Sequence, residues 1–486
     1  MRKQVLLLIF VLSSALSSPG MIIDGYSSST NDRFAKDNAF IAAAFDLSGV
    51  AISQDGRWAT LLSPNVFITA NHYPPGVGQS ITFYRTNDPS GPKITRSVST
   101  VRQRIGTSDL LLCTLNLPVP EGYAFYSFFD RSTLSTRGWQ LLGGKEVYHF
   151  GKSPGNSFSS PLNLAVGKNV IDGRVSNQVV ESPAANGPAI LCAQNTDLGK
   201  IPFETMAQIG DSGGPLFIDT GNNSLQLAGI AWFITSAPST GFSPTGDHAA
   251  DINSFLGTHS LPYQPQAPGS FAGSRLDANQ ISLSWQDLSA VESEYFLERA
   301  EDPEGPWTAL PLVPADATAY LDNSAPSGDV YYRLQARNQT ASDSVLCSVL
   351  TPYSLWAAGI DWGGLDASPT GDASGDGLEN LVSYAFALDP LQPAPAASLP
   401  SLQSPAETLD YSYRQNAAAA DIQFELQYSG SLQAPDWQTV LIDGESITQE
   451  DLGADGPARL MLIRMPAGDF PDPVFFRLEI STSDPP

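Results

Sequence analysis

Residues 208–217 read QIGDSGGPLF and combine the residue types that covalent catalysis by a serine requires. A serine hydroxyl is a weak nucleophile, so a base must take its proton and hydrogen-bond donors must stabilise the oxyanion that forms. Glycine lets the backbone bend so that two N–H groups point at one spot. We therefore expect Ser212 to be the nucleophile and the N–H groups of Gly210 and Ser212 to form the oxyanion hole.

Two upstream stretches offer a general base and a carboxylate. His72 lies near the end of LLSPNVFITANHY (residues 61–73), and Asp109 lies near the start of SDLLLCTL (residues 108–115). Together with GDSGGP, these stretches resemble the motifs of the chymotrypsin/trypsin-like serine endopeptidases over roughly residues 40–258. The resemblance implies that His72 is the general base, that Asp109 orients its imidazole and that Ser212 attacks the substrate. The chain order His, Asp, Ser is that of chymotrypsin, not of subtilisin or the α/β-hydrolases.

The sequence departs from this family at several positions. Tyr73 and Gln208 stand where many members have cysteine, so the corresponding disulfides are not expected. Cys113 and Cys192 match neither place, and they are either free buried thiols or a pair of their own. The family's Ser-Trp-Gly segment corresponds to Ala-Trp-Phe at 231–233, so the serine that usually supports the triad carboxylate is absent or shifted.

The resemblance also places Met206, six residues before the nucleophile, on the floor of the substrate pocket, with Trp232 in the adjoining segment. A thioether cannot pair with a cation, so we expect small or apolar substrate side chains and no preference for basic ones. The alternative is that the loop is shifted and that Met206 fills a gap in the core.

The stretch MIIDG (residues 21–25) is similar to the Ile-Val-Gly-Gly start of those family members that are released from a precursor. The similarity implies Ile22 as a new terminus whose ammonium would pair with Asp211. The alternative is that no such step occurs, since no basic residue precedes Ile22.

Composition indicates an exported protein. The 486 residues include 25 Lys and Arg against 50 Asp and Glu, a balance that repels nucleic acid and anionic lipid. Residues 1–18, MRKQVLLLIFVLSSALSS, have the basic start, apolar run and small residues of a signal peptide. No later stretch is long and apolar enough to cross a bilayer. We expect a secreted, periplasmic or cell-surface protein with no membrane span after signal removal and no nucleic-acid partner.

Short β-rich runs between turns predict a mostly β chain of several modules. We expect a trypsin-like domain of two six-stranded β barrels at 22–260, ending in a short helix at 247–259. A proline-rich boundary at 260–270 follows. A fibronectin type III-like domain is expected at 266–352, a connector at 353–394 and a second β-sandwich-like module at 395–486. The resemblance to fibronectin type III domains rests on Trp285 and on YYRLQARN, where Tyr332, Leu334 and Ala336 alternate inward.

The last module repeats features of the fibronectin-like one. YFLERAEDPEGPWTAL resembles FELQYSGSLQAPDWQTV, and VYYRL (330–334) resembles VFFRL (474–478). This pattern predicts one sandwich used twice, with a longer loop in the second copy. Chance similarity between aromatic strands is the alternative.

The connector carries GDASGDGLENLVSYAFALDP (371–390), which resembles the calcium loops of dockerin-like and thrombospondin-type repeats. The resemblance implies a structural calcium held by Asp372, Ser374, Asp376 and Asn380, because calcium prefers several hard oxygen ligands around one point. Ser383 stands where a bidentate carboxylate is expected, so an acidic solvated turn is the alternative.

The interpretation that unites these features is a secreted serine endopeptidase that needs no cofactor for catalysis and acts on protein or peptide substrates. Its β-sandwich modules would serve as spacers or bind matrix, polysaccharide or a cell-surface ligand. The alternative is a catalytically weak adhesin or binding protein that keeps the protease fold and binds through its sandwich modules.

Overall fold

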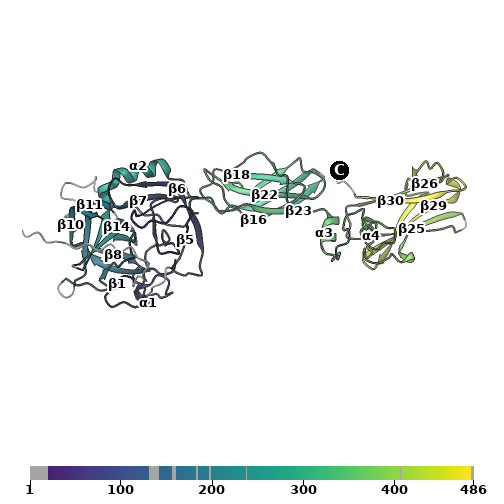
Figure 1. Cartoon of the computed structure of the whole chain (residues 1–486). Coiled ribbons are helices and arrows are strands. Elements are labelled where there is room, and N and C mark those ends of the chain that lie inside the picture. Colours follow the sequence, from purple (N-terminus) through teal and green to yellow (C-terminus); the bar gives the residue numbers. More distant parts are fainter. Residues whose placement is uncertain are drawn as a thin grey trace, which may run out of the picture. The chain divides into compact units, whose positions relative to one another are not determined.

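The computed structural model describes residues 20–130, 142–155, 160–181, 184–195, 199–236, 238–277, 279–405 and 407–482 (Figure 1). The predicted signal peptide therefore lies outside the described residues. The chain divides into two compact units, and the first extends to Ala267 and includes Ser289–Glu294 and Ala336–Asp343. No described helix has the length and apolar character needed to cross a membrane.

A six-stranded antiparallel sheet forms a nearly closed barrel in the first unit. Its order is β2-β3-β4-β7-β6-β5, and β2 and β5 at the two ends lie next to each other. The strands are β2 (Val50–Ile52), β3 (Trp58–Leu61), β4 (Val66–Ala70), β5 (Ser80–Tyr84), β6 (Lys93–Arg104) and β7 (Leu110–Leu115).

Every residue of β4 and β7 is buried, because these two strands lie between two hydrophobic cores. Phe67 and Leu111 belong to one cluster, which also contains Phe83 of the same barrel. Ile68 and Leu112 belong to another cluster, shared with Phe217 of the second sheet. This burial on both faces explains why VFITA and LLLCTL are nearly continuous apolar runs.

The second sheet of this unit has seven strands in the order β10-β11-β15-β14-β13-β8-β9. The strands are β8 (Glu146–Gly151), β9 (Ala165–Val170), β10 (Gly173–Glu181), β11 (Ala184–Ala193), β13 (Pro215–Asp219), β14 (Leu225–Thr235) and β15 (Ser239–Pro244). The short strand β1 (Ile22–Ile23) pairs with β12 (Thr205–Met206). The helical segments are α1 (Ser28–Asn31), η3 (Gly246–His248) and α2 (Ala249–His259), and α2 corresponds to the helix expected at 247–259.

Four further sheets follow the first two. A three-stranded sheet, β16-β17-β21, and a sheet with the path β19-β18-β22-β23 and β20 beside β18 make up the fibronectin-like region. Its strands are β16 (Gly269–Asp277), β17 (Gln280–Gln286), β18 (Glu294–Ala300), β19 (Thr308–Ala309), β20 (Val313–Pro314), β21 (Ala319–Asp322), β22 (Val330–Arg337) and β23 (Val345–Val349). The inward alternation of Tyr332, Leu334 and Ala336 is confirmed, since all three are fully buried.

The C-terminal region repeats this plan with the sheets β24-β25-β29-β28 and β27-β26-β30. Its elements are α3 (Pro352–Ala358), α4 (Asn380–Phe386), η4 (Ala396–Ser398), β24 (Ser401–Gln403), β25 (Thr408–Asn416), β26 (Ile422–Ser429), β27 (Gln438–Thr439), β28 (Thr448–Asp455), β29 (Ala458–Pro466), η5 (Ala467–Asp469) and β30 (Phe475–Thr482). Mostly β architecture, with a six-stranded barrel and further sheets of sandwich type, is thus confirmed. The prediction of two six-stranded barrels is wrong for the second sheet, which has seven strands because β10 and β11 extend it as a hairpin beyond β15.

The predicted internal repeat is visible in three dimensions. The strand orders β19-β18-β22 and β27-β26-β30 correspond, and the matching sequence stretches occupy matching strands. The Arg333 guanidinium lies 4.6 Å from the Trp307 ring centre, and the Arg477 guanidinium lies 4.7 Å from the Trp437 ring centre. In each module the arginine lies in β22 or β30 and the tryptophan directly precedes β19 or β27, so the same cation–π contact recurs at matching positions. Chance similarity is therefore an inadequate explanation.

All three cysteines are free. Cys113 lies in the core of the first barrel and Cys192 in the core of the second sheet, so the pairing left open by the sequence does not occur. The hydrophobic cores, without a disulfide, hold this unit together.

One histidine of the second sheet is fully buried. His149 of β8 has no exposed surface, and neither ring nitrogen has a hydrogen-bond partner among the described residues. Its ring packs edge-on against Phe242 at 4.8 Å. Burial disfavours the charged ring and lowers the pKa of His149 from 6.5 to about 3.

We predict that His149 contributes a loss of stability to this unit as the pH falls from 6.5 toward 3, because the unfolded chain takes up a proton that the native His149 excludes. At pH 4 this contribution is on the order of 3 kcal/mol, from two and a half pH units at about 1.4 kcal/mol each. The buried Asp211, whose pKa is raised to about 6, contributes in the opposite direction, so the contribution of His149 is the difference in pH dependence between wild type and a variant without this ring. Hydrogen exchange of β8 and β13 peptides at pH 7 and pH 4, converted to free energies of opening, measures it. His149→Leu is expected to remove this contribution, and the control His259→Leu, at a partly exposed position, to keep it. Equal acid sensitivity in the two variants would show that another group is responsible.

Candidate active site

Strand pairing brings the base and the carboxylate together. Ala70, the last residue of β4, pairs with Leu110, the first residue of β7. His72 follows β4 and Asp109 precedes β7, so both lie at the same end of the paired strands. The backbone N–H of His72 donates to Oδ1 of Asp109 at 2.9 Å, and His72 Nδ1 lies 2.6 Å from Oδ2. Two hydrogen bonds to one carboxylate fix both the position and the orientation of the imidazole.

The third residue of the predicted triad comes from the loop between β12 and β13. Ser212 Oγ lies 2.8 Å from His72 Nε2. With Nδ1–H donating to Asp109, the neutral ring presents Nε2 as an acceptor for the serine proton. The structure therefore brings His72, Asp109 and Ser212 into one hydrogen-bonded chain from segments 37 and 140 residues apart. This arrangement can activate a hydroxyl for attack on a carbonyl or phosphoryl centre.

Burial controls the electrostatics of the carboxylate. Asp109 is 1% exposed, and this burial raises its pKa, while the hydrogen bonds and charge of His72 and the charge of Arg104 act in the opposite direction. A buried carboxylate beside the imidazole can stabilise the imidazolium that forms when His72 takes a proton.

Glycines shape the loop of residues 207–214 between β12 and β13, which carries Ser212 and is called the nucleophile loop below. Gly210 has φ 100° and Gly213 has φ 93°, in the left-handed region that favours glycine. A Cβ on Gly214 would lie 2.3 Å from the carbonyl oxygen of Phe150, so this position also excludes a side chain. Among the described residues, the N–H groups of Gly210 and Ser212 donate to no acceptor. Both donors that the sequence assigned to an oxyanion hole are thus available to a ligand.

Asp211 anchors the same loop from inside the protein. It is fully buried, its Oδ1 accepts from the N–H of Lys152 at 2.8 Å and its Oδ2 accepts from the N–H of Gln208 at 2.7 Å. Burial raises the pKa of Asp211 to about 6. Ile22, the suggested new terminus, belongs here to uncut chain in β1 and is 45% exposed. The loop is therefore held by two backbone amides in the uncut chain.

The two predicted pocket residues are both buried. Met206 is 7% exposed and pairs with Ile22, and Trp232 is 5% exposed and packs edge-on against Phe233 at 5.1 Å. Burial of Met206 agrees with a closed pocket floor and equally with a core position, so its role stays a prediction.

Arg104 is a site residue that sequence reasoning missed. Its Nε donates to the Ser108 carbonyl, and its Nη2 donates to the carbonyls of Thr107 and Ala184, each at 2.9 Å. It thereby ties the turn before Asp109 to the β10–β11 hairpin, whose Asn186 N–H also donates to Thr107 O at 2.9 Å. The serine that the resemblance would place at Ala231 is absent, and Arg104 holds the backbone next to the carboxylate. Strand β6 also contains Arg96 and Arg102, so nothing in the sequence distinguishes Arg104 as the residue with this role.

The predicted calcium loop adopts a tightly hydrogen-bonded conformation. The carboxylate of Asp372 accepts the N–H groups of Gly375 and Gly377, each at 2.8 Å, and that of Asp376 accepts the N–H groups of Leu378 and Ala394. Two carboxylates and the Ser374 hydroxyl thus lie on one short loop.

The side-chain amide of Asn380 is buried and hydrogen-bonded to backbone groups of the connector. It is 1% exposed, its Nδ2 donates to the carbonyls of Asp366 and Ser368 at 2.7 and 2.9 Å, and its Oδ1 accepts from Ala373 N–H. The side-chain amide thereby tethers the connector, and its oxygen has a second lone pair beyond the one that accepts from Ala373. Calcium binding stays an untested prediction.

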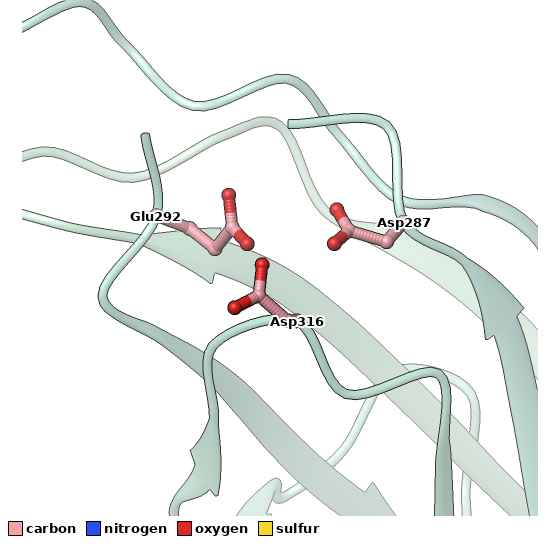
Figure 2. Close-up of side chains that lie close together, drawn as sticks. All are labelled: Asp287, Glu292 and Asp316. Atoms are coloured by element: carbon pink, nitrogen blue, oxygen red, sulfur yellow. The ribbon is translucent and has the colours of Figure 1, made fainter. Parts of the chain in front are cut away.

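A second group of carboxylates was not predicted from the sequence. Asp287 and Glu292 in the β17–β18 loop and Asp316 in the β20–β21 loop point toward one another (Figure 2), and one oxygen of each lies within 4.8 Å of the others. All three have other polar contacts, such as the 2.7 Å hydrogen bond from Tyr295 to Asp287. Acidic groups of this kind are common on protein surfaces, so we assign no ion to them.

Comparisons with known proteins gave only weak structural similarities. No protein-family model matches, and the search of curated proteins found no match. The NS6 protease from murine norovirus 1 is similar at 15% identity over 44% of this chain and 95% of that one, with a TM-score of 0.26. An Fn3-like protein from Clostridium thermocellum shows 20% identity over 18% and 91%, with a TM-score of 0.16. A segment of two fibronectin type III domains from chicken tenascin shows 14% identity over 45% and 91%, with a TM-score of 0.19. At these scores the likenesses decide neither family nor function.

We predict that Arg104→Gln slows the reaction of Ser212 with a fluorophosphonate by about tenfold, because a small displacement of Asp109 misplaces the base. The matched control is Arg102→Gln, which removes the same charge from the same strand and is expected to keep the wild-type rate. Arg104→Lys keeps the charge but not the forked geometry, so it should restore the rate only in part. If Arg102→Gln and Arg104→Gln slow the reaction equally, the loss of a positive charge explains the effect and the hydrogen bonds of Arg104 do not.

We predict that Asn380→Ala weakens hydrogen-exchange protection of residues 366–380 with and without calcium, because it removes the donors to the carbonyls of Asp366 and Ser368. Asp372→Asn is the comparison, and its effect should appear only when millimolar calcium is present. An effect of Asn380→Ala confined to the calcium-loaded protein would identify Asn380 as a ligand and not a tether.

Proposed function

We propose that the chain is an exported serine endopeptidase that hydrolyses protein or peptide substrates. The observation that carries the proposal is the hydrogen-bonded chain Ser212 Oγ, His72 Nε2, His72 Nδ1 and Asp109 Oδ2, with distances of 2.8 and 2.6 Å. A buried carboxylate, a neutral imidazole and a hydroxyl in this order are the parts that acyl transfer by serine requires.

The geometry supports the following sequence of steps. Ser212 Oγ attacks the carbonyl carbon of the scissile peptide bond while its proton passes to His72 Nε2, and the carbonyl oxygen becomes an oxyanion between the N–H groups of Gly210 and Ser212. The C–N bond then breaks, and His72 gives its proton to the leaving amine, which leaves an acyl ester on Ser212. Water attacks this ester, gives its proton to His72 and releases the acid, and the proton returns to Ser212.

The buried carboxylate supports the charge that forms in these steps. Asp109 is adjacent to the ring nitrogen that carries the second proton, so it stabilises the imidazolium without itself taking that proton. Arg104 and the β10–β11 hairpin hold its backbone in place. No metal or organic cofactor has a role in these steps.

The sandwich modules would hold the catalytic unit at one location, as a spacer or a tether does. Sandwich modules that repeat one strand order suit a spacer or a tether, and the acidic composition and N-terminal sequence suit an exported protein. An adhesin that keeps a protease fold is the second candidate function. The intact hydrogen-bonded triad disfavours it, because a binding protein has no need to hold three polar groups in that geometry.

We predict that Ser212→Ala abolishes peptide hydrolysis, with kcat lowered about 10⁶-fold as in other triad enzymes, while binding of substrate persists. His72→Ala should be comparably damaging, and the control Ser224→Ala, at an exposed turn, should match wild type. Release of new amines from casein and from short peptides, measured next to hydrolysis of simple esters, distinguishes a peptidase from an esterase. Wild-type protein that hydrolyses neither, and that resists fluorophosphonate, would favour the adhesin.

A further inference from the structure

The C-terminal module has a hollow in its surface beside the turn that joins β26 to β27. Its volume is about 310 Å³, which suits a small ligand or one unit of a larger one. The hollow lies entirely within the second compact unit, so it is separate from the site at Ser212. Its walls include an aromatic ring, a proline, a carboxylate, an amide and two hydroxyl groups, which belong to Tyr428, Pro471, Asp436, Gln438, Ser429 and Ser431.

The aromatic wall of the hollow is fixed from two sides. Tyr428 of β26 pairs with Gln438 of β27, and the Tyr428 hydroxyl donates to Gln438 Oε1 at 2.8 Å. The Phe470 ring stands at 86° to the Tyr428 ring, with the ring centres 4.9 Å apart, and the next residue, Pro471, lines the hollow. These contacts hold the Tyr428 and Pro471 rings at the same opening before any ligand arrives.

Two serines hold the turn that forms the other wall. Ser429 is 3% exposed, and its hydroxyl donates to the Ser431 carbonyl at 3.1 Å. Ser431 Oγ accepts the N–H of Gln433 at 3.2 Å. Short side-chain bonds to the backbone of this kind stabilise a turn without a sheet or helix around it. The hollow is therefore preformed, which lowers the entropy that a ligand must lose on binding.

Asp436 and Gln438 have hydrogen-bonding capacity left for a ligand. Both side chains are exposed. Within the part of the chain that the structure describes, the carboxylate of Asp436 accepts no hydrogen bond and pairs with no cation. Gln438 Oε1 is taken by Tyr428, and its Nε2 has two N–H groups with no acceptor among the described residues. The hollow thus offers a free acceptor and a free donor two residues apart.

This combination selects the chemistry of the ligand. A hydroxyl group both donates and accepts, so neighbouring hydroxyls can donate to Asp436 and accept from Gln438. An ammonium group only donates and leaves the amide N–H groups unpaired. An anion only accepts, Asp436 repels it, and no Lys, Arg or His lines the hollow. The Tyr428 and Pro471 rings add apolar surface against which the C–H groups of a sugar ring can pack.

The first copy of the repeat shows that the pair of Tyr428 and Gln438 is not a requirement of the fold. Arg299 and Thr308 pair on β18 and β19 where Tyr428 and Gln438 pair on β26 and β27. Arg299 Nη1 donates to Asp322 Oδ2 at 2.7 Å and so joins two strands of its own module. Both copies keep the cation–π contact between arginine and tryptophan, whereas the tyrosine and the glutamine occur at these positions in the second copy alone.

We propose that this hollow binds one sugar unit of a neutral polysaccharide and thereby attaches the protein to that polymer. Asp436 accepts from one sugar hydroxyl, Gln438 donates to another, and Tyr428 packs against the C–H groups of the ring. The excess of 50 acidic over 25 basic residues in the chain disfavours an anionic polymer. Binding needs no reactivity of Ser212, so it is independent of the proposed function.

Calorimetric titration of the full-length protein with starch, laminarin, xylan and galactomannan tests the proposal. We expect at least one of them to bind, with a dissociation constant that stays the same between about 0.05 and 0.5 M NaCl because the ligand is uncharged. Asp436→Ala and Gln438→Ala should each weaken binding about tenfold through the loss of a hydrogen bond. Asp436→Asn keeps an acceptor oxygen and should lie between. The controls Gln403→Ala and Glu445→Ala, at exposed positions of the same module, should bind as wild type does.

A protein that binds none of the four polymers would overturn the proposal, and so would tighter binding of polygalacturonate or polylysine than of every neutral polymer. Binding that Asp436→Ala and Gln438→Ala leave unchanged would show that the hollow is not the site. Tyr428→Ala should also weaken binding about tenfold; should this variant fail to fold, the two exposed positions decide. A wild type that binds a neutral polymer but resists fluorophosphonate would overturn the proposed function alone.

Discussion

The pair of hydrogen bonds from His72 to Asp109 is the constraint on which the catalytic geometry depends. One comes from the backbone and one from the ring, so the carboxylate fixes a main-chain position and a side-chain orientation together. It can do so because β4 and β7 are adjacent, fully buried strands whose paired ends leave His72 and Asp109 side by side. The apolar cores on both faces of these strands therefore position the polar groups at their ends.

The nucleophile loop meets this pair through a different kind of support. Positive φ angles at Gly210 and Gly213 allow the bend, and the buried Asp211 holds it through two backbone amides. Arg104 and the β10–β11 hairpin secure the turn before Asp109. The same hairpin packs against Trp232 and Phe233, so one element contacts both the turn before Asp109 and the aromatic segment of β14.

Sequence reasoning found the features that short stretches encode. The triad could be predicted because each member lies in a distinctive frame, and the repeat because its tryptophans and aromatic strands recur in order. The role of Arg104 depends on its contact with the β10–β11 hairpin, and the local sequence around Arg104 does not indicate that these segments meet. The amide of Asn380 has three backbone partners, which only the folded connector supplies and which the sequence did not indicate. Tertiary contacts, and not local patterns, decide such roles.

The most direct test of the catalytic account is a crystal structure of the protein after reaction with a small fluorophosphonate. The account predicts a covalent bond from phosphorus to Ser212 Oγ and one phosphoryl oxygen within hydrogen-bonding distance of the N–H groups of Gly210 and Ser212. It also predicts that His72 still contacts Asp109 through Nδ1. An unmodified Ser212 in protein treated with excess reagent, or an adduct whose oxygens all point to solvent, would contradict it.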